Sequence, residues 1–248
     1  MKTLLSNKNI LVTGVGKGIG YETTQKIIDC GGFVYGITKN KNDIKKFSKN
    51  LNCKIFIGDA SNDNNIKKIF KFAHKNKKII HGLVNNAGRR QRKEFEKITK
   101  KDLDFIINSN IKTVFNNMQI FFNYAKKIKN SYSIVNIGSI VGKTGFENLV
   151  GYRMTKSALI GLTKSFAVEK RRFLIRANLV NPGFIKTSFY KDFKKNNKKL
   201  YNWTLSRIPS KKWGEPNDIA ILICFLLSDH SKYINGEEIN IDGGWLAS

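Results

Sequence analysis

Proline, cysteine and histidine are scarce in this chain of 248 residues, with three of each. With so little proline, and no stretch rich in Ser, Gly or Pro to divide the chain, we expect one domain over residues 1–248. The cysteines (Cys30, Cys53 and Cys224) are scattered and odd in number, which argues against a disulfide framework and favours a reducing cytoplasm. The histidines do not join them at ligand spacing, so we expect no metal site.

Long apolar runs are also missing. No stretch approaches the roughly 18–20 apolar residues that a membrane-spanning helix needs. The opening residues, MKTLLSNKN, lack the apolar run of a secretory signal. We therefore expect a cytoplasmic protein with no membrane partner.

Acidic residues are few, because 18 Asp and Glu stand against 45 Lys and Arg, and the formal net charge is +27. The lysines are spread along the whole chain and accompany abundant Asn and Ile, which indicates the compositional drift of an AT-rich genome. Nonspecific binding to polyanions at low salt follows from the charge. A specific nucleic-acid partner is not expected, because no basic arm with interleaved aromatics is present.

Short apolar runs alternate with helical segments along the whole chain. The runs that we interpret as strands are Ile10–Val12, Phe33–Ile37, Lys54–Ile57, Ile79–Val84, Ser133–Ile137, Leu174–Val180 and Glu238–Ile241. The helical segments are Gly18–Asp29, Asp43–Asn50, Asn64–Asn76, Lys101–Lys129, Gly151–Lys170 and Pro216–Ser228. This alternation predicts an α/β, doubly wound Rossmann fold, with a central seven-stranded parallel sheet, helices on both faces and a ligand crevice beyond the carboxyl ends of the strands.

Four glycines directly follow the first strand and open the first helix: Gly14, Gly16, Gly18 and Gly20. Glycine lets the backbone approach a pyrophosphate closely, and a helix N-terminus offers free N–H donors. An isolated cluster of this kind is as consistent with a tight packing turn. Its place after the first strand of an α/β chain favours a dinucleotide-binding corner.

Tyr152 and Lys156 stand four residues apart on a predicted helix and therefore share one face. An ammonium beside a phenol favours the phenolate, so we expect the pKa of Tyr152 to be lowered. Such a tyrosine can exchange a proton with an alcohol or carbonyl oxygen near neutral pH.

Six motifs, in order, resemble those of the short-chain dehydrogenase/reductase family over nearly the whole chain. They are TGVGKGIG, NNAG at 85–88, NSNIK with Asn110, Ser139 with the Tyr152–Lys156 pair, IRANLVNPGFIKT and INGEEINIDGGW. The resemblance implies a catalytic tetrad of Asn110, Ser139, Tyr152 and Lys156. In that scheme Ser139 donates a hydrogen bond to the substrate oxygen, Tyr152 transfers the proton, Lys156 stabilises the phenolate and grips the nicotinamide ribose, and Asn110 holds a water. Taken singly, each residue also has a structural interpretation, such as a turn cap or a packed ring.

The resemblance also implies the cofactor contacts. They are Gly14, Gly16, Lys17, Gly18, Ile19, Gly20, Thr38, Lys39, Asp59, Ala60, Asn86, Ala87, Gly88, Tyr152, Lys156, Pro182, Gly183, Ile185 and Thr187. NAD-dependent members carry an aspartate at the end of the second strand, where this chain has Thr38 and then Lys39. With no acid there, and with Lys17 in the glycine motif, we expect NADP(H) to be favoured, with NAD(H) as the alternative. Asp59 is expected to hold the adenine amino group, or instead to cap the next helix.

Three segments depart from the family pattern. Leu174 replaces a usual glycine before the sixth strand. The segment GRRQR, 88–92, is unusually basic where substrate would enter. The variable substrate loop, Ser188–Trp213, is basic and aromatic, with Phe189, Tyr190, Phe193, Tyr201 and Trp203. It suits an anionic, carrier-linked or sugar substrate, or else is a mobile lid of solvated lysines.

We therefore expect an oxidoreductase that interconverts a carbonyl and a secondary alcohol, most like a 3-oxoacyl-carrier-protein reductase, on a small-molecule or carrier-linked substrate. A sugar or polyol dehydrogenase is the alternative, and Arg89, Arg90 and Arg92 would suit an acidic sugar. A cofactor-binding protein without catalysis is a lesser one. The resemblance implies a homo-oligomer, a tetramer or a dimer.

Overall fold

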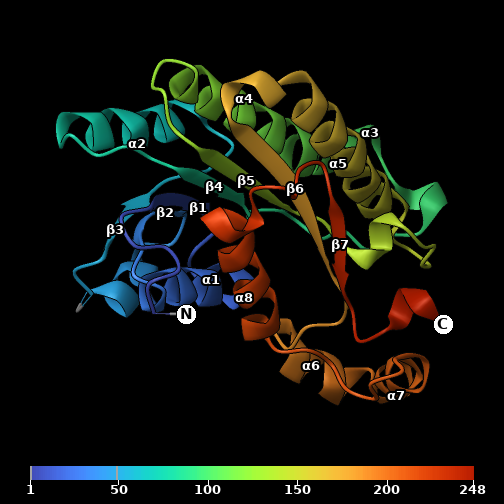
Figure 1. Cartoon of the computed structure of the whole chain (residues 1–248). Coiled ribbons are helices and arrows are strands. Elements are labelled where there is room, and N and C mark those ends of the chain that lie inside the picture. The colour runs from blue at the N-terminus through green and yellow to red at the C-terminus, as the bar shows by residue number, and fades with distance from the viewer. Residues whose placement is uncertain (1, 49) are drawn as a thin grey trace.

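The computed structural model describes residues 2–48 and 50–248. Within them, seven parallel strands form one sheet in the order β3-β2-β1-β4-β5-β6-β7 (Figure 1). The strands are β1 Asn9–Thr13, β2 Phe33–Thr38, β3 Cys53–Ile57, β4 Gly82–Asn85, β5 Tyr132–Ile137, β6 Ile175–Pro182 and β7 Glu238–Ile241. The predicted fold and its seven strands are confirmed, although β4 begins three residues later than its apolar run.

Helices cover both faces of the sheet (Figure 1). They are α1 Gly18–Asp29, α2 Asp63–Lys75, α3 Lys100–Ile107, α4 Thr113–Ala125, α5 Val150–Glu169, α6 Phe189–Asn196, α7 Lys198–Arg207 and α8 Pro216–Leu227. Apolar residues of α2, α4 and α5 pack on one face of the sheet. Those of α1 and α8 pack on the other. β4, β5 and β6 are buried along their full length, and their mainly apolar sequences also carry buried polar residues, among them Arg176 and Asn181.

Three helical predictions need correction. The helix expected over Asp43–Asn50 is a 3₁₀ helix over Lys41–Phe47, capped by Asn40, whose side chain accepts from the Asn42 N–H. The single helix expected over Lys101–Lys129 is α3 and α4 joined by a π-helical turn, Asn108–Lys112. The substrate loop, for which no helix is expected from the sequence, contains α6 and α7, whose apolar residues pack locally and not on the sheet.

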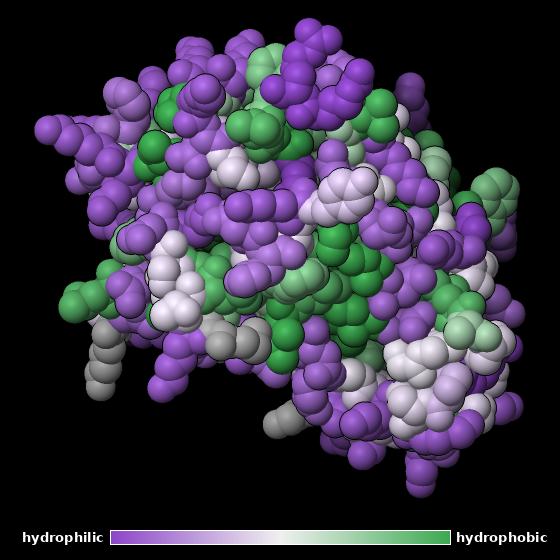
Figure 2. Space-filling view, viewed as in Figure 1, coloured by the Kyte–Doolittle hydropathy of each residue, from purple (hydrophilic) through white to green (hydrophobic). Residues whose placement is uncertain are grey.

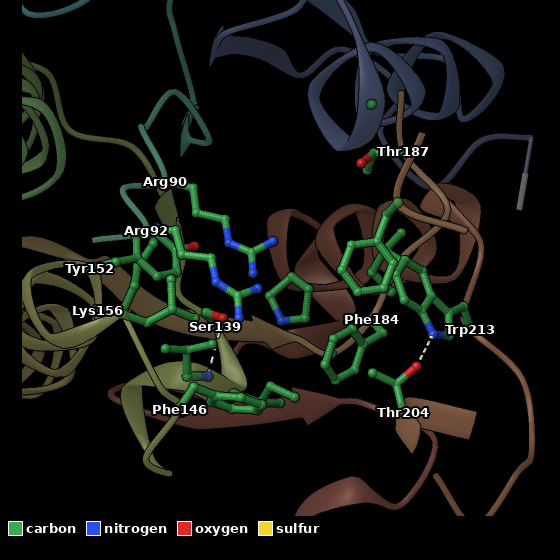
Figure 3. Close-up of a pocket in the computed structure, with 18 of the residues that line it drawn as sticks. Arg90, Arg92, Ser139, Phe146, Tyr152, Lys156, Phe184, Thr187, Thr204 and Trp213 are labelled. Atoms are coloured by element: carbon green, nitrogen blue, oxygen red, sulfur yellow. Dashed lines mark hydrogen bonds between the residues drawn. The ribbon is translucent and has the colours of Figure 1, made fainter. Parts of the chain in front are cut away.

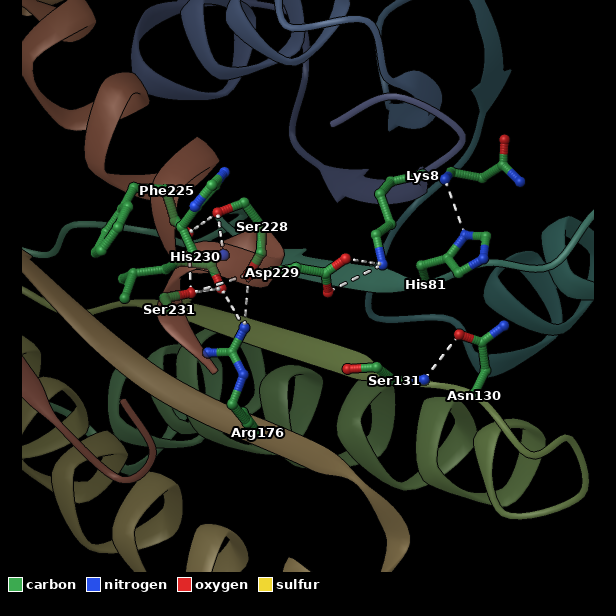
Figure 4. Close-up of polar contacts among 12 residues, drawn as sticks. Lys8, His81, Asn130, Ser131, Arg176, Phe225, Ser228, Asp229, His230 and Ser231 are labelled. Atoms are coloured by element: carbon green, nitrogen blue, oxygen red, sulfur yellow. Dashed lines mark hydrogen bonds and ion pairs between the residues drawn. The ribbon is translucent and has the colours of Figure 1, made fainter. Parts of the chain in front are cut away.

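The amino ends of the strands are tied together away from the glycine corner (Figure 4). The Arg176 guanidinium of β6 is buried and donates to the carbonyl oxygens of Leu226 and Ser228, at 2.9 and 3.2 Å. These oxygens stand at the C-terminus of α8, where a cation is favourable. The Lys8 ammonium pairs with Asp229 at 3.2 Å just beyond that helix end.

Hydrophilic side chains cover most of the face seen in Figure 2, and apolar ones emerge over β7 and α8. β7 is an edge strand, and its Ile239 and Ile241 are half-buried. Among the described residues, no helix combines the length and apolar character needed to cross a membrane.

Candidate active site

A large pocket of about 1160 Å³ lies beyond the carboxyl ends of the central strands (Figure 3). The predicted residues that line it are Lys17, Gly18, Ile19, Asn86, Gly88, Ser139, Tyr152, Lys156, Pro182, Gly183, Ile185 and Thr187. The remaining predicted residues lie outside its lining: Gly14, Gly16, Gly20, Thr38, Lys39, Asp59, Ala60, Ala87 and Asn110. The pocket therefore joins three of the four tetrad residues to part of the glycine corner.

Tyr152 stands in the first turn of α5, and its ring centroid is 5.7 Å from the Lys156 Nζ. Burial raises the pKa of Tyr152 above its ordinary value, against the opposing effects of the Arg90 charge and a hydrogen bond with Ser139. The expectation that Lys156 lowers this pKa is therefore wrong for the structure as it stands. The cation that acts on the phenol is Arg90, and burial outweighs it.

Lys156 is buried, and its Nζ donates to the Ile137 carbonyl oxygen at 2.7 Å. Ile137 ends β5, so this bond fixes the ammonium at the carboxyl edge of the sheet. Burial lowers the pKa of Lys156 to about 8. At neutral pH the amine is therefore mainly protonated, although it is far easier to deprotonate than a solvated lysine.

Ser139 follows β5 and begins a short 3₁₀ turn, Ile140–Gly142. Its backbone N–H donates to Oδ1 of Asn181 at 3.0 Å, and its hydroxyl accepts from the Val141 N–H at 3.2 Å. Asn181 lies on the neighbouring β6 and is itself held by β7, since its amide donates to Glu238 at 2.7 Å. The sequence reading missed Asn181, which supports the serine from behind.

Asn110 is fully buried in the π-helical turn between α3 and α4. Its Nδ2 donates to the Arg89 carbonyl oxygen at 2.8 Å and to Oγ1 of Thr155 at 3.0 Å, and its Oδ1 accepts from the Arg89 N–H at 2.7 Å. The side-chain amide thus ties the Arg89 backbone to α5. Both Nδ2 hydrogens of Asn110 are used in these hydrogen bonds. That Asn110 holds a water stays a prediction, and such a water would have to bind to another polar atom of this residue.

The glycine corner fits a dinucleotide pyrophosphate. Gly14 and Gly18 have φ values of +73° and +56°, which glycine adopts without strain. A Cβ at Gly20 would collide with the Gly14 carbonyl, and one at Gly18 would stand 3.2 Å from Thr187 Cγ2. Lys17 caps α1 without a side-chain hydrogen bond, so no capping side chain occupies the first-turn N–H groups.

Asn86 braces this corner from β4. Its amide donates to the carbonyl oxygens of Thr13 and Gly14, at 3.0 and 3.1 Å. The Thr13 hydroxyl in turn accepts from the N–H groups of Asn86 and Ala87, both at 3.0 Å. These bonds join the ends of β1 and β4 on either side of the crevice.

At the carboxyl ends of β2 and β3, two residues expected to bind the cofactor separately form an ion pair with each other. Lys39 pairs with Asp59 at 2.5 Å, and Asp59 also accepts from the Ser61 N–H. The alternative role of Asp59 as a helix cap is wrong, because Asn62 caps α2, accepting from the Asn64 N–H.

The premise that no acid stands at the end of β2 is also wrong. Asp43, from the following 3₁₀ helix, folds back to accept from the Thr38 hydroxyl at 2.7 Å. Burial raises the pKa of Asp43, but hydrogen bonds from Lys46 and Thr38 prevail and hold it below its ordinary value. The carboxylate is therefore ionised at neutral pH. The sequence offered no signal for it, since Asp43 is five residues from the strand end.

Two arginines from the basic segment enter the pocket. Figure 3 shows the Arg90 and Arg92 side chains extending over Ser139, beside Tyr152. Arg90 is near enough for its charge to couple to both Tyr152 and Arg92. The sequence indicated the basic character of this segment but not its proximity to the phenol.

The substrate loop folds over the pocket around an aromatic cluster, centred on Trp213 (Figure 3). The Trp213 indole donates to the Thr204 hydroxyl at 2.8 Å, and its ring contacts those of Phe184, Phe193 and Tyr190. The loop thus contains two helices with an apolar core of their own. Tyr190, Phe193 and Tyr201 belong to the cluster, Trp203 packs on Trp245, and the Phe189 side chain lies outside the described residues.

Comparison with known proteins assigns the chain to a class. A family model described as enoyl-(acyl carrier protein) reductase matches residues 14–246. The 3-oxoacyl-(acyl-carrier-protein) reductase FabG of Thermotoga maritima is 36% identical over 245 residues, covering 97% of this chain and 98% of that protein. The 2-dehydro-3-deoxy-D-gluconate 5-dehydrogenase of Bacillus subtilis is 32% identical over 248 residues, covering 98% and 96%.

A solved structure agrees with this assignment. The Agrobacterium tumefaciens protein described as a 2-deoxy-D-gluconate 3-dehydrogenase, with bound NADP, superposes with a TM-score of 0.91 at 28% identity, over 100% of this chain and 99% of that one. The chain belongs to the short-chain dehydrogenase/reductase family. It is a nicotinamide-dependent oxidoreductase that interconverts a carbonyl group and a secondary alcohol, and it is similar to 3-oxoacyl-carrier-protein reductases and to sugar-acid dehydrogenases.

Proposed function

We propose that the chain reduces a 3-oxoacyl thioester to the 3-hydroxyacyl thioester, with Tyr152 as the proton donor. The observation that carries this proposal is the convergence of Tyr152, Ser139 and Lys156 in one pocket with the glycine corner. The aromatic cover over that pocket supports an apolar acyl chain, because α6 and α7 present rings to its interior.

The chain's own groups fit proton transfer in the reducing direction. When bound, the reduced nicotinamide supplies hydride to the carbonyl carbon. The Ser139 hydroxyl donates to the oxygen on which negative charge develops. Tyr152 then gives that oxygen its proton, and its raised pKa keeps the phenol protonated at neutral pH. The Arg90 guanidinium stabilises the phenolate that remains.

Asn110 acts as a positioning residue in this proposal. Its side-chain amide forms hydrogen bonds with both the N–H and the carbonyl oxygen of Arg89, the residue before Arg90. The bonds therefore fix the start of the basic segment relative to α5, which carries the tyrosine.

A carboxylated sugar is the second candidate substrate, and Arg90 and Arg92 favour it. Two guanidinium groups beside the proton donor suit a substrate whose carboxylate lies a few carbons from its carbonyl. A neutral thioester carbonyl makes no use of a second guanidinium. The similarity to a 2-dehydro-3-deoxy-D-gluconate dehydrogenase is consistent with this candidate.

For the cofactor, we propose NADP(H) with NAD(H) as a competent alternative. Lys17 in the glycine motif lines the pocket, and Lys39 and Lys46 stand near the ends of β2 and β3. These ammonium groups suit a 2′-phosphate, and the NADP-bound structural relative is consistent with one. The carboxylate of Asp43 opposes it and keeps NAD(H) competitive.

We also propose that the chain self-associates through α4, α5 and β7. Exposed apolar side chains lie on the helices that flank this face, among them Phe105, Phe115 and Val168. β7 adds an open strand edge. Light scattering after size exclusion should give a dimer or tetramer mass, and a monomer at micromolar concentration would contradict this.

The substrate proposal is tested by NADPH oxidation with acetoacetyl thioesters, keto-sugar acids and matched neutral ketoses. We expect turnover of the thioester by the wild type. Arg92→Gln separates the two candidates. It should leave thioester kinetics unchanged, whereas it should raise KM about tenfold or more for a keto acid that binds through its carboxylate. Turnover of neutral ketoses alone would contradict both candidates.

A further inference from the structure

Asp43 and Gly16 form one site at the adenosine end of the crevice. The Asp43 side chain is 11% exposed, and its Oδ1 accepts from the Lys46 Nζ at 2.8 Å. Its Oδ2 accepts from the Thr38 hydroxyl at 2.7 Å. Lys46 also donates to the Gly16 carbonyl oxygen at 2.5 Å. These bonds hold the carboxylate between the end of β2 and the glycine turn.

The glycine at position 16 is what gives the carboxylate room. A Cβ built on Gly16 would collide with both Cγ and Oδ2 of Asp43 and would stand 3.0 Å from the Thr38 hydroxyl. Any larger residue there would force Asp43 out of its place. The two positions, 27 residues apart in the sequence, therefore depend on each other.

The order of the strands locates the ribose at this site. A pyrophosphate at the N-terminus of α1 lies after β1. An adenine beside Asp59 and Ala60 lies after β3. Because β2 runs between β1 and β3, the adenosine ribose must cross the end of β2, where Asp43 stands.

We propose that Asp43 is a cofactor-specificity residue, which accepts hydrogen bonds from the ribose hydroxyls of NAD(H) and penalises the 2′-phosphate of NADP(H). A carboxylate with two acceptor oxygens suits a vicinal diol. A phosphate at the same place would meet a like charge, or would have to displace the carboxylate from Thr38 and Lys46. Lys17, Lys39 and Lys46 supply the opposing attraction, and Asp43 sets the balance between the two cofactors. This inference relies on the proposed function only in requiring a nicotinamide dinucleotide.

The test compares the dissociation constants of NADH and NADPH, measured by isothermal titration with Asp43→Asn, which keeps the shape and removes the charge. We expect the ratio of the NADPH dissociation constant to the NADH dissociation constant to be about tenfold lower in this variant than in the wild type. We also expect NADH itself to bind severalfold more weakly. Asp29→Asn removes the same charge at the far end of α1 and should leave the ratio unchanged.

Gly16→Ala provides a second variant, because it retains the charge but displaces the carboxylate. It should move the ratio in the same direction, and thermal melting of each variant checks that it is folded. If the ratio of the NADH and NADPH dissociation constants in both variants stays within a factor of two of the wild-type ratio, the proposed role of Asp43 is overturned. The assignment of the chain as an enzyme would be unaffected. Absence of binding of either dinucleotide by the wild type would overturn both proposals.

Discussion

The guanidinium of Arg90 lies near enough to the phenol of Tyr152 for its positive charge to oppose the rise in pKa that burial of the phenol causes. The two residues come from different elements, since Arg90 follows β4 and Tyr152 lies in the first turn of α5. The same charge also favours the phenolate that remains after the proton has been donated. The basic segment thus bears on the proton transfer as well as on the substrate.

Arg90→Gln should raise the pKa of Tyr152 further. In the alcohol-oxidation direction, which needs the phenolate, the rise of kcat/KM with pH should move to higher pH. Arg90→Lys keeps the charge and should move the profile less. An unchanged profile in Arg90→Gln would show that the phenol does not sense this cation.

Tyr152→Phe should lower kcat by about a hundredfold to ten-thousandfold, because the general acid is lost while the ring stays in place. The dissociation constant of the dinucleotide should change by less than about threefold, since one hydroxyl is removed from a large interface. Tyr233→Phe, at a fully exposed tyrosine, provides the matched control. Retained turnover in the Tyr152 variant would refute the proton donor.

Leu174→Gly should stabilise the protein. Leu174 links the 3₁₀ turn Arg171–Phe173 to β6 with φ 54° and ψ 32°, a left-handed conformation that costs a leucine about 1–2 kcal/mol. Its side chain is 58% exposed, so little packing is lost. After the entropy cost of glycine, we expect a gain of about 0.5–1 kcal/mol in the free energy of unfolding by urea. Leu174→Ala retains the strain and should gain nothing.

His81 should make the protein less stable in mild acid. Its Nδ1 accepts from the Asn9 N–H at 3.1 Å, so the folded state needs the neutral ring (Figure 4). Burial, aided by the Lys8 charge and opposed by Asp229, lowers its pKa from 6.5 to about 4. Between these two values the unfolded chain binds the proton and the folded one does not, so stability falls as the pH falls from about 6.5 to about 4.

The loss should approach about 3 kcal/mol at most, from the size of that pKa change. His81→Gln can still accept from Asn9 but does not titrate, so its free energy of unfolding should depend less on pH across this window. Parallel curves for the two proteins in urea titrations at pH 4.5 to 7.5 would contradict the assignment.

The sequence was sufficient for the sheet and for part of the lining of its crevice. The β4, β5 and β6 sequences are mainly apolar, because these strands are buried on both faces, and a mainly apolar run can be recognised in the sequence alone. The glycine turn is equally local, since its conformation depends on a few adjacent residues. Both features could therefore be predicted without knowing what packs against them.

The electrostatics of the site could not be predicted in this way. Lys156 is one helical turn from Tyr152, as expected, but it is bonded to the Ile137 carbonyl, which lies on another element. Asp43 lies in the 3₁₀ helix after β2 and accepts a hydrogen bond from Thr38 at the strand end, and Arg90 reaches the phenol from the loop after β4. Each depends on a side-chain direction set by tertiary structure, which spacing in the sequence does not encode.

The chain segments at the two ends of the substrate loop are hydrogen-bonded to each other. Ile185 and Gly214 form a parallel bridge, with the Lys186 N–H donating to the Gly214 carbonyl oxygen and the Gly214 N–H donating to that of Phe184, both at 2.9 Å. The segment between these residues therefore begins after β6 and ends before α8 at one bridged point. The segment between Ile185 and Gly214 can consequently be exchanged as a unit. Replacing it with the corresponding segment of a relative would change the substrate specificity and leave the residues of proton transfer in place.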